Sequence, residues 1–164
     1  MALLSNATAL APPLAPSAPA NPSQLPGRSQ LVIVAAGGRD LTWPPAVIAA
    51  HLLQASAARL VVALLHGASR GADQAIASAA DQLGWPQIAC PASWAEHGRA
   101  AGPIRNRQML QRSIELVASL PAGASLLVIA FPGARGTASL LDQARRLMRC
   151  SALPVAVQQI AAAP

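Results

Sequence analysis

The chain has 164 residues, and twelve arginines, six acids and no lysine give it a formal net charge of +6. This length fits one domain with a sizeable core. No apolar run reaches the ~20 residues that a membrane span needs, so we expect a cytoplasmic protein without membrane contact. Two cysteines, far apart in the sequence, exclude a zinc cluster and a disulfide scaffold, and we expect no metal and no cofactor.

The excess of arginine over lysine has two explanations. Guanidinium groups grip phosphate bidentately, which suits nucleotides or nucleic acid. A GC-rich genome also replaces Lys with Arg and enriches Ala, Pro and Gly, and it explains the total more simply. Position favours a functional role for six of the arginines, which lie in or beside the motifs described below: Arg39, Arg70, Arg99, Arg105, Arg107 and Arg135.

The chain divides into an extension, a domain and a short tail. Residues 1–30 are rich in Ala, Pro and Ser and predict a disordered extension. Apolar runs then alternate with Ala-rich helical segments, which predicts strands at 31–36, 60–65, 87–90, 126–131 and 154–157 and helices at 44–57, 72–83, 103–119 and 137–149, with a long loop over 91–102. The alternation predicts an α/β domain over 31–158, a Rossmann-like, three-layer, doubly wound parallel sheet of about five strands, and a tail over 159–164.

Three glycine-rich runs each follow an expected strand and precede an expected helix. Turns at this edge of a parallel sheet hold ligands, and helix N-termini there bind anions. We expect the glycines to open backbone amides to an anion and the arginines to clamp phosphate. None of the runs matches the dinucleotide fingerprint or the P-loop. The runs are Gly37-Gly38-Arg39-Asp40, His66 to Asp73, and Phe131-Pro132-Gly133-Ala134-Arg135-Gly136-Thr137.

The polar residues of these runs have their own expected roles. Asp40 is predicted to bind a ribose hydroxyl or to cap the next helix. Asp73 is predicted to cap a helix or to orient Arg70, and Thr137 is predicted to cap the last helix. His66, at the end of a strand, is more simply a wall residue than a catalytic base.

A fourth segment, Trp94 to Arg107, contains a tryptophan, a histidine and three arginines in fourteen positions. A solvated surface loop would explain its polarity. Basic residues in a first helical turn oppose the helix dipole, however, so an anionic ligand explains Arg105, Asn106 and Arg107 better.

In this order, the four motifs resemble the SLOG superfamily of Rossmann-like domains, which includes the lonely-guy phosphoribohydrolases and the Smf/DprA proteins, and within it the YspA-like (YpsA-related) group. The resemblance covers about residues 31–157 and implies a nucleotide or nucleotide-derived ligand over the strand ends. Lonely-guy enzymes carry a glutamate that acts on the N-glycosidic bond, and this chain has Leu140 at that spacing, which disfavours their reaction. Those relatives commonly dimerise through helices, so a homodimer through the helix Ile104 to Val117 is one expectation, although core packing explains its apolar positions equally well.

Three functions remain open at this point. The first is a module that binds or senses a phosphorylated nucleoside, with Arg70, Arg105, Arg107 and Arg135 as clamps. The second is an N-glycoside or phosphoester hydrolase that uses Asp40, Asp73, Glu96 or His97 as acid or base. The third is single-stranded nucleic-acid binding, which three Trp, one Phe and no Tyr make less favourable. The candidate catalytic groups are His97, Glu96 and Asp40, and the expected ligand contacts are Gly37, Gly38, Arg39, Asp40, His66, Gly67, Arg70, Gly71, Asp73, Trp94, His97, Arg105, Asn106, Arg107, Pro132, Gly133, Arg135, Gly136 and Thr137.

Overall fold

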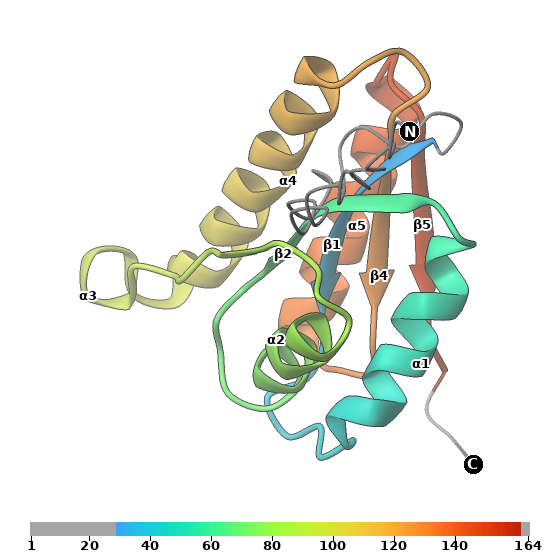
Figure 1. The fold of residues 1–164 in the computed structure, drawn as a ribbon. Coiled ribbons are helices and arrows are strands. Elements are labelled where there is room, and N and C mark those ends of the chain that lie inside the picture. The colour runs from blue at the N-terminus through green and yellow to red at the C-terminus, as the bar shows by residue number, and fades with distance from the viewer. Residues whose placement is uncertain (1–28, 162–164) are drawn as a thin grey trace, which may run out of the picture.

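Five parallel strands form one sheet in the order β3-β2-β1-β4-β5 (Figure 1). The computed structural model describes residues 29–161, so the predicted extension lies almost wholly outside the described residues. The central strand β1 is buried on both faces, which explains its unbroken apolar sequence. The strands are β1 (Gln30–Ala36), β2 (Leu60–His66), β3 (Gln87–Ala89), β4 (Ser125–Ala130) and β5 (Val155–Gln159).

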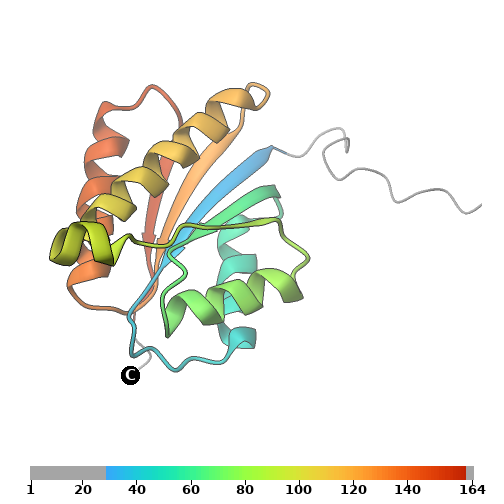
Figure 2. The same cartoon turned by 90° about the vertical axis from the view of Figure 1, so that its left-hand side faces the viewer.

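Helices cover both faces of the sheet, which confirms the predicted three-layer α/β fold. On one face, α1 (Pro45–Ser56) and α2 (Ala72–Gln82) bury Ile48, Leu52 and Ile76. On the other face, α4 (Ala101–Ser119) and α5 (Arg135–Cys150) bury Met109, Leu110 and Leu140. Figure 2 shows the two helix layers on either side of the sheet. No helix of the described chain is long and apolar enough to cross a membrane.

The predicted long loop over 91–102 is wrong. A short helix, α3 (Trp94–His97), and a 3-10 turn, η2 (Gly98–Ala100), lead directly into α4. Helix α4 begins at Ala101, two residues before Pro103. A proline is tolerated there because the amides of a first helical turn have no intrahelical acceptor.

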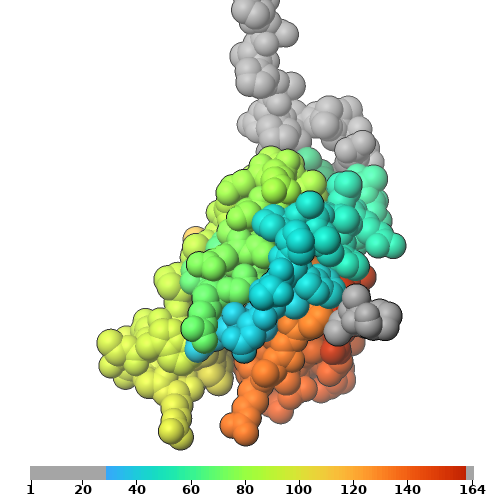
Figure 3. Space-filling view, turned by 90° about the horizontal axis from the view of Figure 1, so that it is seen from below, coloured from blue at the N-terminus to red at the C-terminus, as the bar shows by residue number. Residues whose placement is uncertain are grey.

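The strand order reverses between β1 and β4, and this is where parallel sheets bind ligands. The two strands pair in step from Leu31–Ser125 to Ala36–Ala130, so their carboxyl ends lie at the same level. Figure 3 looks onto this edge of the sheet, where the blue-cyan, green, yellow and orange segments of the chain converge. The turn after β1, the turn after β4 and the starts of α4 and α5 therefore share one surface.

Candidate functional site

The turns at the strand ends are hydrogen-bonded to one another. The amide of Gly38 donates to the carbonyl of Pro132 (2.8 Å), and the amide of Ala72 donates to the carbonyl of Gly38 (3.0 Å). Gly71 has φ +75°, and a Cβ there would strike the carbonyl of Arg39. Glycine at Gly38 and Gly71 thus lets protein backbones meet, and the expectation of an open amide is wrong for Gly38, whose amide is bonded to Pro132.

A cavity of about 600 Å³ lies at these strand ends, and we call it the switch-point cavity. Its walls come from the turns after β1 and β4, from Trp94 in α3, from η2 and from the first turns of α4 and α5. Four predicted segments therefore meet at one site. The predicted ligand contacts that it brings together are Gly37, Gly38, Arg39, Asp40, Asp73, Trp94, Arg105, Asn106, Arg135, Gly136 and Thr137.

The N-terminus of α5 offers free backbone donors to this cavity. No side chain caps the helix, and its first backbone bond runs from the amide of Ala138 to the carbonyl of Ala134 (3.0 Å). The amides of Arg135, Gly136 and Thr137 precede that bond and so have no intrahelical acceptor. A Cβ at Gly136 would meet no atom within 4 Å, so this backbone is open. Thr137 lies inside the helix and does not cap it, contrary to prediction.

Three arginines that line the cavity are not neutralised by the protein. Within residues 29–161, the ion pairs within 4.0 Å do not include Arg39, Arg99 or Arg135. All three are exposed. The cavity therefore carries a positive potential that attracts anions.

A buried polar chain runs behind the cavity and links α2, α4 and α5. Asp73 Oδ2 accepts from the amide of Ser69 (3.1 Å) and lies 3.8 Å from Arg105 Nη1. Arg105 Nε donates to Asn106 Oδ1 (3.0 Å), and Asn106 Nδ2 donates to the carbonyl of Gly136 (3.1 Å). Asn106 thereby fixes the first turn of α5 from behind.

The Asp73–Arg105 ion pair corrects the predicted pairing of Asp73. Asp73 pairs with Arg105 and not with Arg70, which lies 3.9 Å from the exposed Asp40. Burial raises the pKa of Asp73 and lowers the pKa of Arg105. Arg105 therefore lines the cavity as the partner of Asp73, and its role as a ligand clamp stays a prediction. Gly67 leaves room for this pair, because a Cβ there would displace the Arg105 guanidinium.

The turn after β2 satisfies its own amides. His66 Nδ1 accepts from the amide of Ala68 (3.2 Å), and the Ser69 amide bonds to Asp73 as described. The sequence predicted that this turn would present free amides to an anion. The amides of Ala68 and Ser69 are instead bonded within the turn. His66 is buried, its pKa is lowered by that burial, and it holds the turn, in keeping with a wall residue.

A second cavity of about 610 Å³, which we call the outer cavity, adjoins the first. Gly67 and Arg70 line it, and both cavities share Arg39, Ser69 and Trp94. The remaining predicted contacts line neither cavity: His66, Gly71, His97, Arg107, Pro132 and Gly133.

The candidate acid-base groups of α3 lie away from both cavities. Glu96 Oε2 is 3.6 Å from His97 Nε2, and neither residue lines a cavity wall. Leu140 is fully buried in the core, so its side chain does not reach the cavity either. Among the described residues, no group of three or more His, Cys, Asp or Glu could hold a metal ion.

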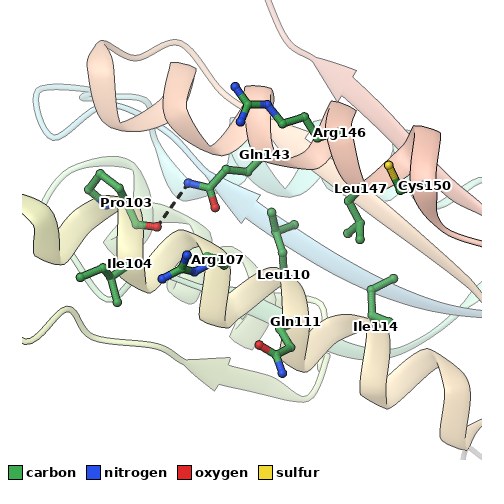
Figure 4. Close-up of a pocket in the computed structure, with 10 residues that line it drawn as sticks. All are labelled: Pro103, Ile104, Arg107, Leu110, Gln111, Ile114, Gln143, Arg146, Leu147 and Cys150. Atoms are coloured by element: carbon green, nitrogen blue, oxygen red, sulfur yellow. Dashed lines mark hydrogen bonds between the residues drawn. The ribbon is translucent and has the colours of Figure 1, made fainter.

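Arg107 belongs to a different feature, a groove of about 660 Å³ between α4 and α5 (Figure 4). Gln143 Nε2 crosses it to the carbonyl of Pro103 (3.2 Å). The groove is slightly larger than the switch-point cavity, but its lining is mostly apolar, from Ile104 to Leu147. It lies along α4 and α5, shares Pro103 with the switch-point cavity, and is not lined by Arg135, Gly136 or Thr137.

Sequence reasoning assigned Arg99 a functional role without naming it as a ligand contact, and it did not single out Ser69; both line the switch-point cavity. A helical reading of 94–100 would have placed Arg99 beside the strand ends. Nothing in the sequence distinguishes Ser69 from an ordinary turn residue.

Residues 31–97 match the sequence model of the YspA, cpYpsA-related SLOG family. The match runs from β1 to the end of α3, and so includes the first two glycine turns and Trp94. No curated protein and no solved structure matches the chain. The five-stranded Rossmann-like sheet agrees with the SLOG fold. Over residues 31–97 the chain is therefore similar to the YspA, cpYpsA-related SLOG family, which supports the resemblance predicted from its motifs.

Proposed function

We propose that the protein binds a nucleotide or nucleotide-derived, phosphorylated ligand in the switch-point cavity. The observation that carries this proposal is the uncapped N-terminus of α5, with its free amides, beside the three unpaired arginines Arg39, Arg99 and Arg135. Backbone donors and guanidinium groups in one place suit the several oxygens of a phosphate group. Similarity to a SLOG family supports a nucleotide-related role in general.

The size of the cavity favours a ligand larger than a single ion. Small-molecule sites typically enclose about 300–1,000 Å³, and this cavity encloses about 600 Å³. A phosphate group at the start of α5 leaves space for a sugar between the turns after β1 and β2. Ser69 and Asp40 line this part of the cavity and offer hydrogen-bonding groups to hydroxyls.

The hydrolase alternative has less support than binding. Glu96 and His97 lie outside the cavity, and Asp73 is engaged with Arg105. Asp40 is the exposed carboxylate that remains at the cavity wall, and it lies near Arg70. Single-stranded nucleic-acid binding, the homodimer and a cytoplasmic location stay predictions.

Isothermal titration calorimetry tests the proposal on the full chain. We expect AMP, ADP-ribose or ribose 5-phosphate to bind and adenosine to bind far more weakly. Arg135→Ala should weaken the binding of phosphorylated ligands at least about tenfold, because a hydrogen bond to a charged group contributes about 1.5–3 kcal/mol. Arg107→Ala is the matched control, since this arginine lies in the α4–α5 groove.

Two results would contradict the proposal. One is that none of the phosphorylated compounds binds. The other is that Arg107→Ala weakens binding as much as Arg135→Ala, which would mean that only the net charge matters.

A further inference from the structure

The switch-point cavity and the outer cavity are separated by one stacked pair. The guanidinium carbon of Arg39 lies 4.8 Å from the centre of the Trp94 ring, a cation–π contact. Both residues line both cavities. Trp94 is 46% exposed, and it is the one aromatic side chain among the exposed large apolar residues of the described chain. Trp94 therefore offers an exposed aromatic ring at the place where the two cavities adjoin.

The outer cavity differs from the switch-point cavity in that the N-terminus of α5 does not line it. Its wall combines the small groups of Gly67, Ala68, Pro91 and Ala92 and the indole of Trp94 with the polar side chains of Arg39, Ser69 and Arg70. The amides of Ala68 and Ser69 are already bonded within the turn. The outer cavity thus offers a flat aromatic ring beside small apolar groups, and these two turn amides are not available to a second phosphate.

We propose that the outer cavity binds the base of the nucleotide, stacked against the Arg39–Trp94 pair, while the phosphate lies at the N-terminus of α5. This inference rests on the proposed function and adds an orientation and a ligand class to it. The two cavities share Arg39, Ser69 and Trp94, so a nucleotide that occupies both would lie against these three residues. The ligand class is then a phosphorylated nucleoside with its base attached, rather than a sugar phosphate.

Stacking on an indole is tolerant of base identity because every base has a π-face. Loss of one such stack weakens binding about five- to 150-fold. Purine and pyrimidine nucleotides should therefore bind with similar affinity. The guanidinium of Arg39 adds a second planar surface to the stack.

The test compares three ligands by calorimetry: ribose 5-phosphate, AMP and ribose 1,5-bisphosphate. In the unmodified chain, AMP should bind at least tenfold more tightly than ribose 5-phosphate. Trp94→Ala should reduce the affinity for AMP to that for ribose 5-phosphate. The affinity for ribose 5-phosphate itself should stay within about threefold of its value in the unmodified chain. Trp94→Phe, which keeps a ring, should retain most of the AMP affinity. AMP should also quench tryptophan fluorescence in the unmodified chain and much less in Trp94→Phe.

The outcomes separate this inference from the function on which it rests. Equal affinity for ribose 5-phosphate and AMP would overturn the base site and leave phosphate binding standing. A different result is that ribose 1,5-bisphosphate exceeds ribose 5-phosphate in affinity by as much as AMP does, and loses this advantage in Arg70→Ala. That result would show that the outer cavity binds a second anion instead of a base. Binding of none of the three ligands would overturn both proposals.

Discussion

Replacing Arg105 with Met should destabilise the fold by about 3–5 kcal/mol, because it leaves the Asp73 carboxylate buried without its partner. The side chains of Asp73 and Arg105 are only 4% and 12% exposed. For unit charges 3.8 Å apart, an effective dielectric constant of about 20 gives an attraction of about 4 kcal/mol. The Ser69 amide remains as a donor to Asp73 but carries no full charge.

The attraction between the two groups is not their net contribution to stability. Burial already raises the pKa of Asp73 despite the neighbouring guanidinium, so desolvation offsets much of the attraction. Asp73→Asn should also destabilise, because it leaves Arg105 buried and charged. The double variant Asp73→Asn with Arg105→Met removes both charges. Its loss of unfolding free energy should be smaller than the sum of the two single losses by at least about 2 kcal/mol.

Urea unfolding at pH 7 of the four proteins in this double-mutant cycle measures the coupling. A coupling below about 0.5 kcal/mol would refute the ion pair as a mutually dependent unit. The pH dependence gives a second readout. A folded-state pKa raised above 3.8 contributes stability that is present below 3.8 and is lost as pH rises through the folded value. Arg105→Met raises that pKa further, so its deficit should be larger at pH 7 than at pH 4.5.

Two further predictions follow from other parts of the structure. Burial lowers the pKa of His66 below 6.5 in the folded chain, so the free energy of unfolding should fall as pH drops below 6.5. His66→Gln should flatten this pH dependence in urea titrations between pH 5 and 7, and an unchanged slope would contradict the prediction. If a homodimer forms through the α4–α5 groove, Ile114→Glu should give a monomer in sedimentation velocity and Gln111→Ala should leave the dimer intact. An unmodified chain that is monomeric at high concentration would contradict the homodimer.

The sheet was predictable because its central strands are covered on both faces. The run from Leu31 to Ala36 could be assigned as a parallel strand from apolarity alone, since its buried pattern has no polar side. The glycine turns marked the carboxyl edge for the same reason, because each follows such a run. Placement of the site at that edge needs only the alternation of strands and helices.

The roles of individual side chains depend on the exact start of a helix, which the sequence did not reveal. Arg105 and Arg107 are two residues apart on α4, which is about 200° around the helix axis. One therefore faces Asp73 and the other faces the α4–α5 groove. Similarly, a start of α5 at Arg135 instead of Thr137 moves the threonine from a cap into the first turn and frees the amides before it.

The pairing of Asp73 was beyond sequence reasoning for another reason. Its partner comes from a helix that begins 28 positions later in the chain, since Asp73 lies in α2 and α4 begins at Ala101. Arg70, three residues away, was the nearest cation in sequence. The short turn after β2 instead directs Arg70 to the surface, where it approaches Asp40.

The positions of the arginines indicate which kind of anion the positive charge of the chain can bind. Arg105 is paired with Asp73 and Arg107 lies in the α4–α5 groove, so Arg70 and Arg135 are the two expected clamps that are exposed at the wall of the two cavities. The arginines that remain around the two cavities are Arg39, Arg70, Arg99 and Arg135, gathered at one edge of the sheet. A single nucleic-acid strand is normally held along an extended basic groove with several aromatic side chains, whereas this edge offers a compact cluster and one exposed indole. The arrangement of charge therefore favours one small anionic ligand over a polymer.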